Sequence, residues 1–220
     1  MAVHSLRVPI DGTSVGEAAV YAVPLDDGVA LVDAGWPSDA AWTAFTAALD
    51  DAGVAMKDIR HVLITHAGHT CFLHTGEDVL FTGDHLLARI TPNVGQQSIE
   101  DGSQPLADFL ASVRLVAALG ARRALPAHGP EFDDVAGRAA QIEGHHERRL
   151  TDVAALVAER PGISGYDVAR RLRWAKPWDA FTPPMRRSAV GEALAHLVHL
   201  RGAGLIHSSD DLVVRWYPIA

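Results

Sequence analysis

The chain has 220 residues, and its composition excludes several classes of protein. A hydrophobic fraction of 48% and a charged fraction of 21% are typical of a globular protein, whereas disordered chains are poor in apolar residues. No apolar run approaches the roughly 20 residues that span a bilayer, and the first residues lack the basic and apolar regions of a signal peptide. The single cysteine, Cys71, cannot form an internal disulfide, which is typical of a reducing compartment. We therefore expect a cytoplasmic protein without a membrane segment.

The net charge of −8 is unevenly distributed along the chain. Residues 1–137 carry 7 Lys and Arg against 18 Asp and Glu, whereas residues 138–220 carry 12 against 9. Because phosphate backbones bind basic surfaces, the first part disfavours nucleic acid, and the second part leaves an anionic partner open. The chain also has 12 histidines, and imidazole is the commonest metal ligand. Metal chemistry is therefore the first functional hypothesis.

Short strands separated by turn sequences are expected up to about residue 133, because β-branched residues alternate with Asp-Gly and Gly-containing turns. The expected strands cover residues 6–10, 18–25, 29–33, 61–65, 70–74, 79–82 and 124–127. The apolar sequence HVLIT over residues 61–65 predicts a buried strand. Helices are expected from Ser38 or Asp39 to Gly53 and from Pro105 to Leu119, where apolar residues recur at helical spacing.

Helices replace strands after this point. The expected helices cover residues 134–160, 166–173 and 188–201, and the expected strands cover 205–208 and 212–216. This order of three helices and a hairpin is typical of a winged helix. Because charge and element type change together near residue 137, we expect an α/β domain over 1–137 and a helical, winged-helix-like α+β domain over 138–220.

Three polar segments follow predicted strands, at Thr65-His66, at residues 82–85 and at residues 126–129. Strand ends are where a rigid sheet projects ligands and catalytic groups. Each segment alone is compatible with an ordinary polar residue at a strand end. Together, His66, Asp84 and His128 predict a metal site.

Five sequences between Leu31 and Pro130 carry a resemblance to a known family: LVDAG, VLITH, VLFTGDHLL, RITPN and LPAHGP. In these the chain resembles the metallo-β-lactamase-fold hydrolases, in the branch of glyoxalase II-like and β-lactamase-like 2-type proteins with a C-terminal winged helix. The resemblance implies an αββα sandwich and a site for two metal ions, usually zinc. It also implies hydrolysis of a thioester, ester or phosphodiester by a metal-activated water.

The resemblance implies roles for four residues. His66 matches the first histidine of the family's HxHxDH motif, Asp84 matches the aspartate that bridges both metals, and His128 matches the last histidine of the second metal. Asp33 matches an aspartate that orients the ligands. Asp84 is therefore the expected catalytic residue, and imidazole and carboxylate are ligands that suit zinc.

The chain departs from the family pattern after His66. Where the family continues x-H-x-D-H, the chain reads Ala67-Gly68-His69-Thr70-Cys71, so three ligands have no counterpart. The simplest account is an internal deletion near residues 66–69, which leaves the sandwich incomplete. His69 matches either the metal-binding histidine or the second, non-ligand histidine of a later motif, G-H-T-x-G-H, and it is a further candidate ligand. We therefore expect at most one weak zinc site, with activity reduced or absent.

The remaining candidates have structural interpretations. Cys71 is expected to be a small buried hydrophobic residue. The helical histidines are expected to be solvated: His145, His146, His196 and His199. The basic cluster near the C-terminus has Arg and Lys at 170, 171, 173, 176, 186 and 187. The cluster is either a solvated surface or a site for RNA or a cofactor phosphate.

Two functions from different classes follow. The first is a zinc hydrolase with a small ester or thioester substrate, in a chain that forms a homodimer if the deletion uncovers a sheet face. The rival function is a non-catalytic protein that binds an anionic partner such as RNA through its basic C-terminal region.

Overall fold

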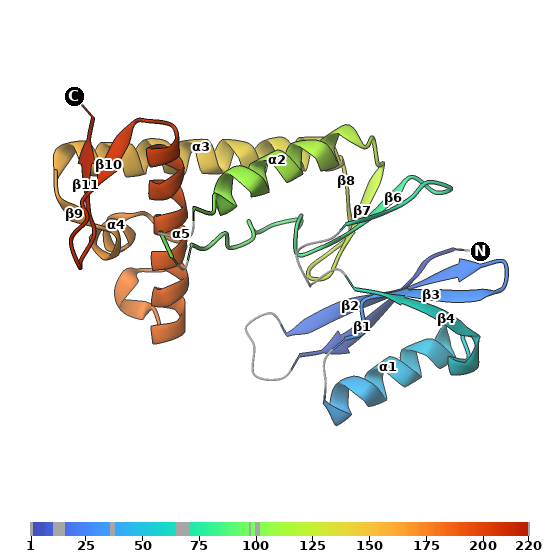
Figure 1. Cartoon of the computed structure of the whole chain (residues 1–220). Helices are drawn as coiled ribbons and strands as arrows, with labels where there is room; N and C mark the ends of the chain where they lie inside the picture. The colour runs from blue at the N-terminus through green and yellow to red at the C-terminus, as the bar shows by residue number, and fades with distance from the viewer. Residues whose placement is uncertain are drawn as a thin grey trace. The chain divides into compact units, whose positions relative to one another are not determined.

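The computed structural model describes residues 2–10, 16–35, 38–64, 71–96, 98–99 and 102–219, and Figure 1 shows their elements. The chain divides into two compact units, the first made of Met1–Pro92 and Ala117–Arg138 and the second of Asn93–Val116 and Ala139–Ala220. Residues 93–116, which the sequence analysis places in the N-terminal domain, belong to the second unit, and the domain boundary near residue 137 stays a prediction. Within the described residues, no helix is long and apolar enough to cross a membrane.

The first sheet of the first unit follows the expected strands closely. It contains β1 (His4–Pro9), β2 (Glu17–Leu25), β3 (Gly28–Val32) and β4 (Ile59–Leu63), in that order. β1, β2 and β3 pair antiparallel, whereas β3 and β4 pair parallel, with Leu31 opposite Val62. The parallel pair requires a crossover, which α1 (Asp39–Asp51) and a short 3₁₀ turn (Met56–Asp58) supply.

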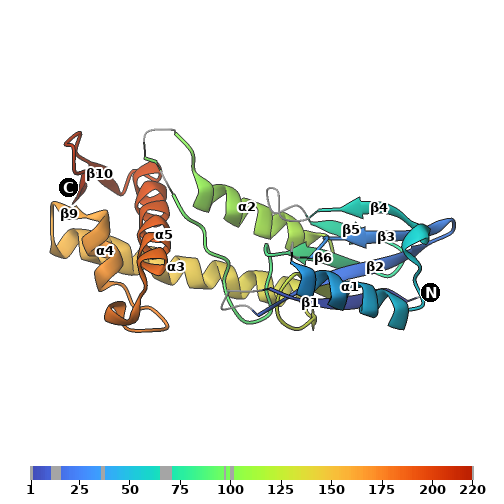
Figure 2. The same ribbon diagram turned by 90° about the horizontal axis from the view of Figure 1, so that it is seen from below.

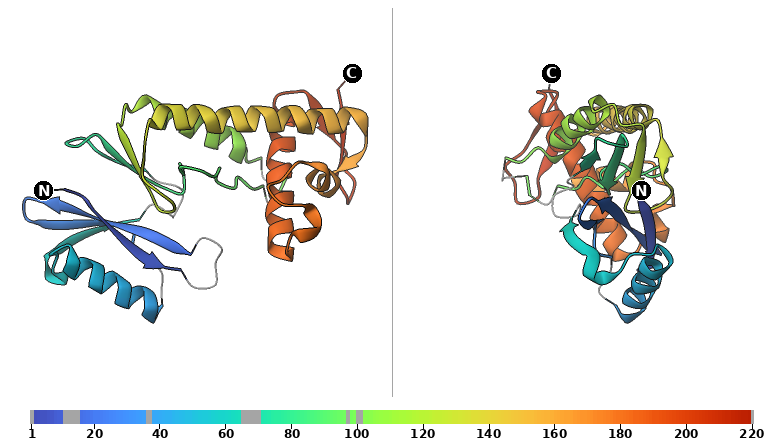
Figure 3. Two further views of the ribbon diagram at one scale, coloured as in Figure 1. Left: turned by 180° about the vertical axis from the view of Figure 1, so that it is seen from behind. Right: turned by 90° about the vertical axis from the view of Figure 1, so that its right-hand side faces the viewer.

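The helix α1 covers one face of this sheet, as Figure 3 shows. Ser38 caps it, because its hydroxyl oxygen accepts a hydrogen bond from the Ala41 backbone N–H at 3.2 Å. Phe45 and Leu49 of the helix are buried with Leu31 of the sheet in one apolar cluster. Burial of this apolar stripe is what holds the helix on the sheet.

The second sheet packs against the other face of the first. It contains β5 (Phe72–His74), β6 (Val79–Gly83), β7 (Arg123–Pro126) and β8 (Phe132–Asp133), in that order. β6 and β7 are parallel, and the outer pairs are antiparallel. The rings of Tyr21 and Phe81 lie 5.3 Å apart within the core that both sheets share. β5 and β6, which correspond to the strands expected over residues 70–74 and 79–82, form a β-hairpin.

The second unit is mainly helical. Two helices extend across the boundary between the units: α2 (Pro105–Ala118) ends in the first unit, and α3 (Val135–Glu159) begins there. The elements that follow are β9 (Ile163–Ser164), α4 (Gly165–Arg171), a 3₁₀ turn (Trp178–Ala180), α5 (Pro183–Gly202), β10 (Ile206–Ser208) and β11 (Arg215–Pro218). The three strands form a sheet in the order β10-β11-β9. Trp216 is fully buried beside Val153 and Leu197, and Figure 2 shows α3, α4 and α5 around this region. The winged-helix interpretation stays a prediction.

Two expectations were wrong in detail. The strand expected to be buried over 61–65 is β4, Ile59–Leu63, and its last apolar side chains are exposed, with Val62 at 49% and Leu63 at 36%. β4 lies at the sheet edge, and an apolar run cannot distinguish a covered strand from an uncovered one. The last helix begins at Pro183 rather than at 188, because two prolines are tolerated in a first helical turn.

Candidate functional site

The ends of two parallel strands bring Asp84 and His128 together. Asp84 directly follows β6, and His128 comes two residues after β7. These strands are neighbours with Gly83 opposite Pro126, so their carboxyl ends meet at one edge of the sheet. His128 Nε2 lies 3.4 Å from Asp84 Oδ1. The structure therefore pairs two of the residues that the sequence singled out.

A second contact fixes the His128 ring. Its Nδ1 lies 2.9 Å from the Glu17 backbone oxygen at the start of β2. When Nδ1–H donates this hydrogen bond, Nε2 carries the lone pair and faces Asp84. The side chains of His128 and Asp84 are 14% and 30% exposed, so both are partly shielded while remaining accessible. This is the arrangement of a metal-ligating histidine, whose other nitrogen is usually held by a carbonyl or a carboxylate.

Backbone hydrogen bonds hold the segment that carries His128. The Ala127 N–H donates to the Gly83 oxygen at 3.0 Å, and the Ala127 oxygen accepts from the Ala19 N–H at 2.8 Å. The buried Tyr21 hydroxyl donates to the Pro126 oxygen at 2.7 Å. Burial raises the pKa of Tyr21 well above its ordinary value, so this hydroxyl keeps its proton. The site is thus built on a rigid part of both sheets.

The turn after β6 is fixed in a similar way. The fully buried Thr82 hydroxyl donates to the Leu86 oxygen at 2.8 Å. Gly83 adopts a left-handed conformation with φ of 52°, which glycine accommodates without a Cβ clash. This turn redirects the chain so that Asp84 leaves the strand toward the sheet edge.

Asp33 lies at the corresponding end of β3 in the first sheet. It is buried and has a φ of 68°, a left-handed conformation that is uncommon outside glycine. Its backbone N–H donates to the Leu63 oxygen at 2.6 Å. Its role in orienting ligands stays a prediction.

His128 Nε2 and Asp84 Oδ1 have the spacing of two ligands of one zinc ion. Tetrahedral zinc with bonds of about 2.1 Å places neighbouring ligand atoms about 3.4 Å apart, which is the separation of His128 Nε2 from Asp84 Oδ1. Over the part of the chain that the structure describes, no three His, Cys, Asp or Glu side chains form a metal-binding group. His66 and His69 lie outside the described residues, so their contribution stays a prediction.

Cys71 lies near this region, directly before β5. Its Sγ lies 3.8 Å from the Thr82 oxygen, and burial raises the pKa of the thiol to about 11. The expectation of a small hydrophobic residue at this position agrees with its partial burial.

Sequence reasoning missed a buried polar cluster in the second unit. His146 of α3 and His196 of α5 were expected to be solvated, but they are 1% and 0% exposed. His146 Nδ1 lies 3.1 Å from His196 Nε2, and His196 Nδ1 lies 2.7 Å from the backbone oxygen of Glu192. Burial lowers the pKa of His146 to about 3 and that of His196 to about 4. The position of His146 in the apolar stripe with Ile142 and Val153 could have indicated its burial.

Comparisons with known proteins bear on the whole chain. No family model matches it. It is 31% identical over 170 residues to a lactamase-like protein nscB of Neosartorya fischeri, a match that covers 69% of this chain and 48% of the relative. It is 28% identical over 171 residues to a beta-lactamase-like protein 2 homolog of Caenorhabditis elegans, covering 76% of this chain and 53% of the relative. The chain thus spans about half the length of these curated relatives.

Two solved structures are similar over nearly the full chain. One is a metallo-beta-lactamase family protein from Thermus thermophilus, with a TM-score of 0.81, 22% identity and coverage of 99% of this chain and 98% of that one. The other is a beta-lactamase domain protein from Burkholderia ambifaria, with a TM-score of 0.81, 21% identity and coverage of 99% and 91%. At these identities the likeness concerns the fold. The chain therefore has the metallo-β-lactamase fold.

Proposed function

We propose that the chain is a zinc-dependent hydrolase of the metallo-β-lactamase superfamily that cleaves an ester, thioester or phosphodiester. The observation that carries this proposal is the 3.4 Å pairing of Asp84 with His128 at adjacent strand ends, with the far side of the imidazole held by the Glu17 oxygen. The similarity to lactamase-like proteins and the fold support the same conclusion. We further propose that the departure after His66 limits the chain to one weakly held zinc ion and to slow turnover.

The residues of this chain perform three tasks in the proposed reaction. His128 would present Nε2 to the metal, because its other ring nitrogen contacts the Glu17 backbone oxygen. Asp84 would supply a carboxylate oxygen to the metal and would accept a proton from water. The adjacent strand ends of β6 and β7 hold both groups at one sheet edge. A bound zinc ion would supply an acidified water and polarise the scissile carbonyl or phosphoryl group.

Zinc content provides the test, and it does not depend on finding the substrate. After dialysis against zinc and then buffer, elemental analysis should give at most one ion per chain, which mild chelation removes. The Asp84→Ala variant should lose most of this zinc, whereas Asp152→Ala, which removes an exposed carboxylate of α3, should retain it. Hydrolysis of a phenyl thioester, a nitrophenyl ester and a bis-nitrophenyl phosphodiester should fall at least about tenfold in Asp84→Ala. Two tightly held ions, or one ion that Asp84→Ala does not affect, would contradict the proposed site.

A further inference from the structure

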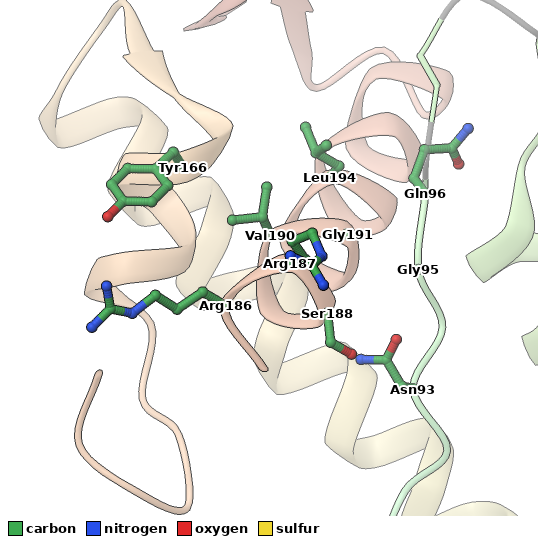
Figure 4. A pocket seen from close by; sticks show the side chains of 10 residues that line it. All are labelled: Asn93, Gly95, Gln96, Tyr166, Arg186, Arg187, Ser188, Val190, Gly191 and Leu194. Carbon is green, nitrogen blue, oxygen red and sulfur yellow. The ribbon is translucent and has the colours of Figure 1, made fainter. Parts of the chain in front are cut away.

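A cavity in the second unit is lined by cationic and polar side chains that the proposed metal site does not use. Its volume of about 700 Å³ lies within the range of small-molecule sites. Residues 93–96, the first turn of α4 with Tyr166, and residues 186–194 of α5 line it. Figure 4 shows the side chains of this cavity, with the Tyr166 phenol and the Arg186 guanidinium extending to the same side.

Backbone contact defines one wall of the cavity. The Gln96 N–H donates to the Gly191 oxygen at 2.9 Å, so the segment 93–96 is tied to α5. A Cβ atom at Gly191 would lie 3.5 Å from the Gly95 Cα, which shows that the two glycines approach to van der Waals contact. The close approach leaves this wall without bulky side chains, and the shape of the cavity is set by the backbone there.

Two arginines at the cavity lack an anionic partner in the described part of the chain. Arg186 Nε is buried there without a hydrogen-bond partner, and its guanidinium lies 5.9 Å from the centre of the Trp178 ring. Arg187 is exposed and forms no ion pair with any residue that the structure describes. Three other arginines of the unit form ion pairs: Arg149 pairs with Glu192 at 3.3 Å, Arg171 with Asp167 at 3.1 Å and Arg114 with Glu143 at 2.5 Å. Arg186 and Arg187 differ from these three, and they line the cavity.

The carboxylate next to the cavity does not compensate these charges. Glu192 follows Gly191 in α5, but its oxygens contact Arg149 at 3.3 Å and Asn93 at 3.2 Å. Among the described residues, no Asp or Glu lines the cavity. The described lining of the cavity consequently includes two arginines and the Ser188 hydroxyl without a carboxylate to compensate them. Such a group of donors attracts an anion.

We propose that this cavity binds the phosphate group of a small phosphorylated organic molecule. A guanidinium donates two parallel hydrogen bonds to a phosphate, and two guanidiniums with a hydroxyl offer more donors than the two oxygens of a carboxylate can use. Tyr166, Val190 and Leu194 line the same cavity and would contact the organic part. This site is independent of the proposed zinc site, because none of its residues is a candidate metal ligand.

Calorimetric titration with phenyl phosphate, inorganic phosphate and benzoate tests the proposal. Wild-type protein should bind phenyl phosphate with a dissociation constant below about 1 mM, and more tightly than either of the other two. Arg187→Gln should weaken phenyl phosphate binding at least about tenfold, and because Arg187 is exposed its replacement should not disturb the fold. Arg170→Gln, which removes another exposed arginine of the same unit that does not line this cavity, is the matched control and should bind as the wild type does.

Three results would overturn the proposal. One is that Arg186→Gln and Arg187→Gln both bind phenyl phosphate with the affinity of the wild type, while circular dichroism shows that all three proteins are folded. Another is binding of inorganic phosphate alone, which would indicate a general attraction for anions. The third is binding of single-stranded RNA without binding of phenyl phosphate, which would assign the cavity to a polyanionic partner. Weaker binding in both arginine variants, with Arg170→Gln unchanged, would support it.

Discussion

Tyr21 connects the two sheets of the first unit at the segment that carries His128. Its hydroxyl donates to the Pro126 oxygen, and its ring packs against Phe81. Because this hydrogen bond is buried, water cannot replace the donor. We expect Tyr21→Phe to lower the free energy of unfolding by about 1 kcal/mol, since the ring stays in place and only the hydrogen bond is lost. We also expect weaker zinc binding, because His128 lies two residues beyond Pro126.

Urea unfolding and zinc titration measure these two effects. Tyr217→Phe is the control, because it removes a hydroxyl from β11 in the second unit. If Tyr21→Phe leaves both stability and zinc affinity at the wild-type values, the hydrogen bond does not position the site.

The position and contacts of some residues could be predicted from the sequence, whereas those of others could not. The proximity of Asp84 and His128 could be predicted from the sequence, because both residues follow strands and parallel strands end at one sheet edge. His146 could be placed only in part, because its position in the apolar stripe of α3 indicates burial but not the group that it contacts. Its partner His196 lies 50 residues further along the chain, and local patterns carry no information on such a contact.

We expect the contact between α3 and α5 to make the second unit sensitive to acid. Burial lowers the pKa of His146 to about 3 and that of His196 to about 4, whereas an unfolded histidine has a pKa near 6.5. Below about pH 6.5 the unfolded state therefore binds protons that the folded state does not. Stability should be greatest above this pH and should fall as the pH is lowered toward 4, by up to about 1.4 kcal/mol per pH unit for each histidine.

Unfolding in urea between pH 7.5 and 4.5 tests this expectation. A double variant, His146→Phe with His196→Met, removes both partners of the hydrogen bond together and should show a flatter dependence on pH. His207→Gln, at an exposed position of β10, should keep the slope of the wild type. An equal slope in the double variant and the wild type would show that other groups control the acid response.

The edge strand β4 exposes an apolar surface. Val62, Leu63 and Ile64 are 49%, 36% and 44% exposed, and among the described strands β4 pairs only with β3. Parallel strands are normally covered on both faces, and uncovered apolar edges promote association. We expect the double variant Val62→Thr with Ile64→Thr to reduce concentration-dependent association by at least about twofold while keeping the fold, because threonine retains β-propensity.

Sedimentation and light scattering over a range of concentrations measure this association. Leu115→Thr, which changes an exposed apolar residue of α2, should leave it unchanged. If the β4 variant associates as strongly as the wild type, the edge strand is not the surface involved.

At the level of elements, sequence patterns were sufficient for most strands and helices of the chain. Asp-Gly and Gly-containing turns bounded β1 to β3, and apolar residues at helical spacing bounded α1 and α2. The two-residue strand β9 was missed, because its pairing with β11 involves only Ile163 and Ser164. So short a ladder has no periodicity, and only the fold of the C-terminal hairpin reveals it.

Each unit of the molecule has its own core and its own cluster of titratable side chains. Tyr21, Phe81 and Leu125 are buried where the two sheets of the first unit meet, whereas Val153, Leu197 and Trp216 are buried in the second. The proposed zinc ligands belong to the first unit, and the buried histidine pair belongs to the second. Removal of metal and addition of acid should consequently act on different parts of the chain.

Hydrogen exchange followed by mass spectrometry can separate these two responses. Chelation of zinc at pH 7.5 should increase exchange around residues 79–87 and 123–129, because bound metal stabilises only the states that hold its ligands together. Lowering the pH to 5 should increase exchange, after correction for the intrinsic rate, around residues 142–150 and 192–200, where protonation opposes burial of the histidines. In Asp84→Ala the response to chelation should vanish while the response to acid persists. A chelation response centred on residues 142–200, or one that Asp84→Ala retains, would place the metal away from the ends of β6 and β7.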